Sequence, residues 1–305
     1  MNPKFLPHIA LFLVALFYGG NYSVAKLVMD PGYIGANGFI VMRLAFGCLV
    51  FWTIHTLFVR EKLQRADFGR VFLCGLLGAT INLLFFFNGL ERTTPINAAL
   101  LMTTVPILVL ICSSILLKER ITKKKLLGIA IGATGAVLLI LYGNKFAYQS
   151  TTLLGDLMVF FNAVSYGFYL VVVKRLMERY NPLTIVKWIF LVGLLFCMPI
   201  GWADLRVVSW NSIPTNIWFA VAYVLVLATV GTYLLNLFAL SKVNASVVSI
   251  YIYLQPLLAA IISIALQQET LDWSKATAAA CIFIGVYLVS SPNPQRPSHT
   301  LRENK

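Results

Sequence analysis

The sequence predicts an all-α integral membrane protein of ten transmembrane helices, arranged as two inverted repeats of five helices. Three observations lead to this prediction: the composition, the recurrence of long apolar runs, and a similarity between the two halves of the chain. Of the 305 residues, 59% are hydrophobic and only 11% are charged, whereas soluble domains average roughly 25% charged residues. Apolar runs of about 20 residues, the length that spans a bilayer, recur along the whole chain.

The apolar runs leave no room for a separate soluble domain. Because the first run lacks a basic leader and a small-residue cleavage site, we expect it to be a membrane span and not a signal peptide. We expect repeats at 1–145 and 146–292, followed by a polar cytoplasmic tail at 293–305. The predicted spans lie at 8–28, 37–58, 68–89, 95–117, 123–142, 153–174, 182–201, 215–240, 245–266 and 273–291.

The two halves of the chain share a pattern at an offset of about 150 residues. Tyr18 in the first span also matches Tyr166 in the sixth, at an offset of 148. Five spans in each half is an odd number, so the second half enters the membrane in the opposite orientation, as in many secondary transporters. The first set of matched residues is Pro106, Ser113, Glu119, Gly135 and Leu138, and the second is Pro256, Ser263, Glu269, Gly285 and Leu288.

Lysine and arginine gather in alternate connections between the spans. If the N-terminus is cytoplasmic, that side carries 17 of these residues, whereas the opposite side carries only Arg92, Lys145, Arg206 and Lys275. The positive-inside rule therefore predicts that both termini are cytoplasmic. We attribute the net charge of +13 to this topology and to contact with anionic lipid, and we expect no nucleic-acid partner.

The sequence offers no pattern for catalysis or for a metal. The five cysteines fall in five different spans without paired spacing, which is typical of small buried apolar residues. There is no His-Glu-x-x-His motif, no Gly-x-Ser-x-Gly elbow and no phosphate-binding loop. We therefore expect neither an enzyme nor an ATP-driven pump, and no cofactor.

The chain resembles the EamA family of the drug/metabolite transporter superfamily over essentially its whole length. The order of several features along the chain carries this resemblance. These features are Asn97-Ala98-Ala99 before Pro106, LLKERI at 116–121, the glycine-spaced run from Gly128, and Arg43 in the second span. In the second half, Pro256, Glu269 and Gly285 repeat part of this pattern. In one departure, Asn244 lies twelve residues before Pro256, whereas Asn97 lies nine before Pro106. The resemblance implies export of amino acids or similar metabolites across a bacterial inner membrane by alternating access.

Polar residues within the spans are the candidate substrate-binding residues, because polar groups in lipid turn toward a cavity or toward each other. Helical spacing places many of them on shared faces of spans one, three, four, six, eight and nine. Alternatively, each one only hydrogen-bonds a neighbouring helix. The candidates are Tyr18, Asn21, Arg43, Asn82, Thr103, Asn162, Tyr166, Tyr169, Tyr233, Asn236 and Tyr253.

Other residues in the spans are given structural interpretations. Pro106 and Pro256 each interrupt a helix, and could act as hinges or only shape the packing. Lys26 and Lys187 are expected to be snorkelling anchors. The small residues from Gly128 to Gly135 favour close packing within one chain, with a homodimer as the alternative to a monomer.

The aromatic lining suits a zwitterion with an apolar side chain better than a sugar phosphate, since only Arg43 is placed to bind an anion. The alternative is a membrane receptor or assembly protein that transports nothing. We expect no acidic residue or histidine deep in a span, because Asp156 is shallow and Glu91 lies at a span end. We therefore predict facilitated diffusion or exchange and not proton coupling.

Overall fold

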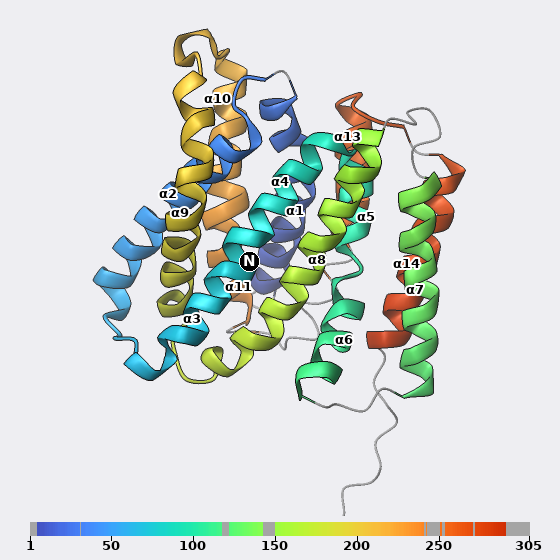
Figure 1. Ribbon diagram of the computed structural model, residues 1–305, viewed down its shortest axis with the longest axis horizontal. Helices are drawn as coiled ribbons and strands as arrows, with labels where there is room; N and C mark the ends of the chain where they lie inside the picture. Colours follow the sequence, from blue (N-terminus) through green and yellow to red (C-terminus); the bar gives the residue numbers. More distant parts are fainter. Residues whose placement is uncertain are drawn as a thin grey trace, which may run out of the picture.

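The computed structural model describes residues 5–30, 32–117, 122–142, 150–240, 242, 251, 254–270 and 272–290. Within these residues the regular structure is helical and contains no strand (Figure 1). The α-helices are α1 (Leu6–Met29), α2 (Ala36–Ile54), α3 (Phe68–Gly75), α4 (Asn82–Arg92), α5 (Pro95–Met102), α6 (Val105–Leu117), α7 (Lys123–Tyr142), α8 (Ser150–Met177), α9 (Pro182–Val207), α10 (Thr215–Ala222), α11 (Thr232–Leu240), α13 (Leu254–Ala265) and α14 (Trp273–Ser290).

Seven helical stretches of the described chain are long and apolar enough to cross a membrane. They are Leu6–Met29, Ala36–Val59, Arg65–Arg92, Pro95–Leu116, Thr152–Met177, Pro182–Val207 and Thr215–Asn236. Of the three remaining predicted spans, those at 123–142 and 273–291 coincide with α7 and α14, and α13 forms the described later part of the span at 245–266. Every predicted span therefore contains a helix, and the chain is a multi-pass membrane protein, while the count of ten crossings stays a prediction.

The helices run between two ends of one bundle (Figure 1). We call the upper end in Figure 1 the Arg92 end, because α4 finishes there at Arg92. We call the lower end the His55 end, because α2 passes there into a short π-helix, His55–Val59. The chain crosses between these ends repeatedly, so residues far apart in sequence meet at each end.

Small residues allow the central helices to pack closely. Helix α2 packs along α9, α4 along α8, α1 along α13, and α7 along α14. A Cβ atom added to Gly285 on α14 would lie 2.6 Å from Cα of Gly132 on α7, and one added to Gly135 would lie 2.8 Å from Cβ of Cys281. These glycines are therefore used for packing within the chain, as the preferred interpretation of the glycine run expected.

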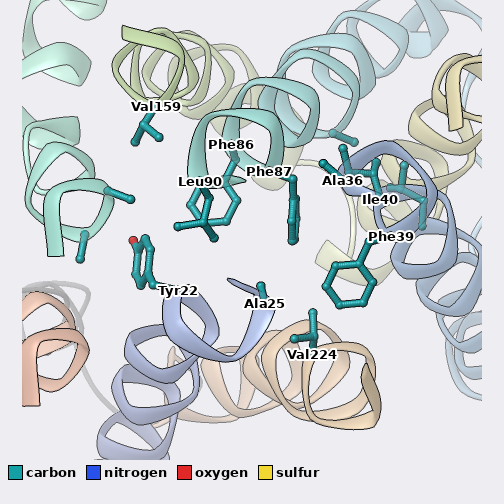
Figure 2. Close-up of a cluster of buried hydrophobic side chains, with 14 of the residues drawn as sticks. Tyr22, Ala25, Ala36, Phe39, Ile40, Phe86, Phe87, Leu90, Val159 and Val224 are labelled. Carbon is teal, nitrogen blue, oxygen red and sulfur yellow. The ribbon is translucent and has the colours of Figure 1, made fainter. Parts of the chain in front are cut away.

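Apolar side chains fill the core of the bundle, and several aromatic ones meet in the part nearer the Arg92 end. Figure 2 shows Tyr22, Phe39, Phe86, Phe87 and Leu90, contributed by α1, α2 and α4, with Val159 of α8 and Val224 beside them. The ring centroids of Tyr22 and Phe86 lie 5.6 Å apart, and those of Phe39 and Phe87 also lie 5.6 Å apart. Such aromatic pairs contribute about 0.5–1.5 kcal/mol beyond the burial of their surface. We call these five residues the aromatic layer.

Spans three and eight each contain a π-helix, η3 (Leu76–Ile81) and η5 (Tyr223–Gly231). In each segment a threonine hydroxyl donates to the carbonyl five residues earlier: Thr80 to Gly75 at 3.4 Å, and Thr229 to Val224 at 2.8 Å. The helical ladder is locally rewound there, which releases backbone carbonyls for other donors. Span four is also interrupted, at Thr103 and Thr104 between α5 and α6.

Candidate solute pathway

Four of the candidate tyrosines and Arg43 meet near the middle of the bundle. Tyr18 of α1 lies within electrostatic range of Arg43 of α2, and also of Tyr166 and Tyr233. The rings of Tyr166 and Tyr169, both on α8, have centroids 5.6 Å apart. We call Tyr18, Arg43, Tyr166, Tyr169 and Tyr233 the tyrosine cluster. Its members come from both halves of the chain.

The neighbouring packing fixes the rings of the tyrosine cluster in place. Gly78 of η3 makes room for Tyr169, because a Cβ atom at position 78 would lie 2.6 Å from the Tyr169 ring. Tyr233 of α11 packs against Phe51 and Phe190, with centroid distances of 5.4 Å and 5.8 Å. Tyr18, Tyr166 and Tyr233 are nevertheless half-buried, so part of each ring borders space and not packed atoms.

Arg43 is a buried cation, only 8% exposed. Its Nη2 donates to the carbonyl oxygen of Ala228 in η5 at 3.3 Å, and its guanidinium lies 5.5 Å from the centre of the Phe87 ring. Among the described residues it forms no ion pair. A charge inside the bilayer costs several kcal/mol unless an opposite charge or several hydrogen bonds compensate for it. Arg43 is therefore the strongest candidate for binding an anionic group of a solute.

Two asparagines add unused hydrogen-bond acceptors on the Arg92 side of the tyrosine cluster. Asn21 is 3% exposed and Asn162 is 1% exposed, and neither side-chain oxygen has a hydrogen-bond partner among the described residues. The Asn162 amide nitrogen donates to the carbonyl oxygen of Asn82 at 2.7 Å. With a rise of about 1.5 Å per residue, Asn21 lies roughly 4.5 Å beyond Tyr18 and Asn162 roughly 6 Å beyond Tyr166. Orphaned buried acceptors are costly and indicate a missing donor.

The remaining candidates are placed less favourably or lie outside the described residues. The Thr103 hydroxyl donates to Leu100 O in its own turn at 2.6 Å, so it serves the helix break. Asn236 is half-buried on α11. Pro106 is the second residue of α6 and Pro256 the third of α13, positions that proline tolerates. Tyr253, Glu119, Asn244 and the tail at 293–305 lie outside the described residues.

Sequence reasoning missed a network of buried polar groups at the Arg92 end. Asp156 on α8 is shallow, as expected, but it is 0% exposed. Its carboxylate accepts from the Thr93 hydroxyl and from the Asn97 amide, the latter at 3.2 Å. Nearby, Glu269, whose side chain is 4% exposed, accepts from the Ile96 backbone N–H at 2.9 Å and pairs with Lys275. We call Thr93, Asn97, Asp156, Glu269 and Lys275 the Asp156 network.

The expectation that Lys26 and Lys187 are snorkelling anchors is wrong for Lys187. Lys187 on α9 is 7% exposed, and its ammonium lies 2.9 Å from His55 Nδ1 and 4.6 Å from the centre of the Trp52 ring. Packing between α2 and α9 therefore supplies partners that a helix facing lipid would lack. Lys26 is directed to protein atoms as well, because its ammonium donates to Leu90 O at 3.1 Å and to Thr93 O at 2.8 Å.

The hydrogen bonds around His55 specify its protonation. The Thr184 hydroxyl donates its single proton to Glu61 Oε2 at 2.5 Å. His55 Nε2 lies 3.1 Å from the same hydroxyl oxygen, so Nε2 must be the donor in that bond. His55 Nδ1 then accepts from the Lys187 ammonium. His55 is thus neutral, with its proton on Nε2, and it joins α2 to α9 at the His55 end.

Known proteins resemble the chain over nearly its whole length. The sequence profile of the EamA-like transporter family matches residues 6–141 and 153–291. The uncharacterized transporter YyaM of Bacillus subtilis is 28% identical over 85% of each chain. An uncharacterized transporter of Archaeoglobus fulgidus is 26% identical over 97% of this chain and all of its own. A WAT1-related protein of Arabidopsis thaliana is 22% identical over 92% of this chain and 84% of its own.

A solved crystal structure has the same fold. It superposes with a TM-score of 0.60, covering 93% of this chain and 96% of the other. At 17% sequence identity, this similarity concerns the fold alone.

Proposed function

Because this chain belongs to the EamA-like transporter family, we propose that it exports or exchanges a small zwitterionic metabolite, such as an amino acid, across a bacterial inner membrane. The observation that carries this proposal is Arg43, a buried cation without an ion-pair partner among the described residues, beside half-buried tyrosine rings. The solute would bind at the tyrosine cluster, and the protein would expose that cluster to the two sides of the membrane in turn.

The substrate class follows from the groups that lack partners. Arg43 would bind the carboxylate of the solute through charge-assisted hydrogen bonds, which are stronger than its present bond to a neutral carbonyl. The orphaned oxygens of Asn21 and Asn162 would accept from an ammonium group. The rings of Tyr166 and Tyr169 would contact an apolar side chain. A sugar phosphate fits less well, because it would bring two negative charges to a single guanidinium.

We propose that the ten predicted spans form an inverted repeat, which would allow exposure of the site to each side in turn. The family profile matches the chain in two stretches, and the packing pairs agree with a two-fold relation between halves at 1–145 and 146–292. Helix α2 of the first half packs on α9 of the second, and α4 on α8 parallels α1 on α11. In this arrangement the Arg92 end faces outward and both termini are cytoplasmic.

Labelling of single introduced cysteines tests this orientation. A cysteine at Asn211, at the Arg92 end, is expected to react with an impermeant thiol reagent added outside intact cells, whereas one at Arg65 should react only after the cells are opened. Reversed labelling would contradict the proposed orientation. The native cysteines lie within helices and none is fully exposed, which keeps the background low.

The aromatic layer packs on the Arg92 side of Arg43, with Phe39, Phe87 and Leu90 fully buried. Outward release of a solute would therefore require this layer to separate.

Transport in proteoliposomes tests the proposal against a receptor or assembly protein, which would move no solute. We expect the protein to exchange L-phenylalanine, with much weaker exchange of phenethylamine and 3-phenylpropionate, which lack one charge each. Arg43→Gln should lower exchange about tenfold or more, since a lost charged hydrogen bond costs roughly 1.5–3 kcal/mol. Asn21→Ala, Tyr166→Ala and Asn236→Ala should also lower it. Ala130→Leu on the exposed face of α7 is the matched control and should leave substrate choice unchanged.

Energy coupling is tested in the same vesicles. With no acidic residue in the tyrosine cluster, we propose exchange or facilitated diffusion. An imposed pH gradient should then leave the final solute distribution unchanged. Uphill accumulation that an ionophore abolishes would contradict this, and its loss in Asp156→Asn or in Glu91→Gln would identify the carboxylate responsible.

A further inference from the structure

An open cleft of about 610 Å³ lies at the Arg92 end, separate from the tyrosine cluster. The start of α2, the last turns of α4 and the segment that ends α9 form its walls. These walls carry uncharged polar side chains together with positively and negatively charged ones. The polar side chains that line the cleft include Asn37, Asn88, Glu91, Arg92, Asp204 and Ser212.

Some of these polar side chains already form hydrogen bonds within the protein. The Asn88 amide donates to the Asn37 side-chain oxygen at 2.8 Å. Asp204 Oδ2 accepts from the Gly38 backbone N–H at 3.3 Å, and an added Cβ atom at Gly35 would lie 2.7 Å from the same oxygen. Asp204 therefore caps the start of α2. Its position makes it a fixed negative charge in the wall of the cleft.

Glu91 and Arg92 are the two charged side chains available to a ligand. Their side chains are 33% and 36% exposed. Arg92 Nη1 lies 3.3 Å from Glu91 Oε2 and donates to Asn88 O at 2.6 Å. An exposed ion pair of this kind is weak, so a solute competes with it easily. With Asp204 included, the cleft holds one carboxylate more than it holds cations.

The cleft adjoins the aromatic layer. Ala36 lines the cleft and also packs in the cluster drawn in Figure 2. On α4, the cleft residues Asn88 and Glu91 alternate with Phe87 and Leu90 of the aromatic layer. The cleft and the aromatic layer therefore occupy different faces of the same turns of α4.

We infer that this cleft is a second solute site, which binds the ammonium group of a small zwitterion at Glu91 and its carboxylate at Arg92. The two sites differ in electrostatic sign. The tyrosine cluster has an excess positive charge at Arg43, whereas the cleft has an excess negative charge, so the cleft favours amines and zwitterions over simple anions. Binding in the cleft needs no conformational change, and only its place on the transport route rests on the proposed function.

Protection of an introduced cysteine tests this site. Ser212 is exposed and lines the cleft, so Ser212→Cys should react with a soluble maleimide when the full chain is held in phosphatidylglycerol nanodiscs. The probes are L-serine, ethanolamine and lactate, with the unsubstituted protein as the labelling blank. L-serine and ethanolamine should slow the reaction and lactate should not. Equal protection by lactate would overturn the proposal.

Two variants in the Ser212→Cys background locate the effect. Glu91→Gln should weaken protection about three- to fivefold, the value of one exposed ion pair. Asp30→Asn is the matched control, because Asp30 is an exposed carboxylate at the same end that does not line the cleft. Unchanged protection in Glu91→Gln, or an equal loss in Asp30→Asn, would show that the cleft is not the site.

Two further measurements distinguish the cleft from the tyrosine cluster and from a lipid site. Arg43→Gln, which should stop exchange, is expected to leave protection by L-serine intact, and loss of protection would mean that the two sites are not independent. A phosphatidylethanolamine headgroup carries the same pair of charges as a zwitterion. Slow labelling in phosphatidylethanolamine nanodiscs without any added solute would assign the cleft to lipid and overturn the solute site.

Discussion

The Arg92 end and the His55 end both hold residues 1–145 against residues 146–292, but they do so through different helices. At the Arg92 end, the Asp156 network joins the α4–α5 corner to α8 and to the segment before α14. Gln268 also donates to Ser23 O of α1 at 3.1 Å. At the His55 end, most described bonds join α2 and its connection to α9 and the segment before it, through His55, Glu61 and Lys187.

The two ends therefore lose different partners when they open. Helices α1 and α8 carry three of the four clustered tyrosines, and at the Arg92 end Gln268 and the Asp156 network hold them. At the His55 end, His8 Nδ1 of α1 lies 3.1 Å from the Tyr251 hydroxyl, and just after α8 the buried Tyr180 hydroxyl donates to the buried Asp67 carboxylate at 2.8 Å. Each buried polar group left unpaired costs about 1–3 kcal/mol.

Of the four substitutions, the removal of Asp156 should change the difference between the two ends most strongly. Asp156→Ala leaves the Thr93 hydroxyl and the Asn97 amide without their acceptor and weakens the closed Arg92 end. With Leu90→Cys as a reporter in the aromatic layer, we expect labelling from the Arg92 side to become about tenfold faster or more, since each unpaired group costs roughly 1–3 kcal/mol. Asp30→Asn should leave the rate nearly unchanged. Labelling that stays slow in Asp156→Ala would show that the aromatic layer closes this end unaided.

Removing Lys187 should lower stability without changing access. Lys187→Met keeps the apolar stem but leaves His55 Nδ1 without a donor, at a cost of about 1–2 kcal/mol in the free energy of unfolding. The thermal unfolding midpoint of the purified protein should fall, while Leu90→Cys labels at its original rate. Faster labelling of that cysteine would mean that α2 and α9 also control the Arg92 end.

Gly78→Ala should disturb the middle of the bundle and neither end. It therefore separates effects on the tyrosine cluster from effects on the two ends. The new methyl group would lie 2.6 Å from the Tyr169 ring, and overpacking of this kind costs about 1–3 kcal/mol. We expect weaker L-phenylalanine exchange in proteoliposomes with unchanged Leu90→Cys labelling. Gly69→Ala is the matched control in the same span, because a Cβ atom there has no contact within 4 Å.

Glu61→Gln should have the smallest effect of the four. Glutamine keeps an oxygen that accepts from the Thr184 hydroxyl and from the Asn181 N–H, so only the charge is lost. The expected change in the free energy of unfolding is less than about 1 kcal/mol, measured by thermal unfolding. A drop as large as that of Lys187→Met would mean that the negative charge of Glu61 is needed to hold the neutral His55 and the Lys187 ammonium together.

Helical spacing and the internal repeat predicted where the helices lie, and they predicted that Tyr18, Tyr166 and Tyr233 occupy the inward faces of three different spans. They also identified Arg43, because a cation so far inside an apolar run must either bind a solute or pair with neighbouring protein groups. The burial of Asp156 and the partners of Lys187 could not be predicted in the same way. Periodicity specifies which face of a helix a residue occupies, whereas burial near a helix end depends on which other connection packs there. The π-helices were missed because Gly78, Thr80 and Thr229 are equally compatible with an ordinary α-helix.

The π-helices make the orientation of the later half of spans three and eight depend on local winding. Removing one residue between Tyr223 and Gly231 would let that segment return to ordinary α-helix, with 3.6 residues per turn. Because a π-helical turn holds one residue more than an α-helical turn, the chain after this deletion would keep its present orientation. If the segment returned to ordinary α-helix with all its residues, the chain after it would rotate by about 100° around the helix axis and turn Tyr233 away from Phe51 and Arg43. The sequence of these spans thus encodes an angle as well as a set of side chains, and the extra residue of the π-helix maintains that angle.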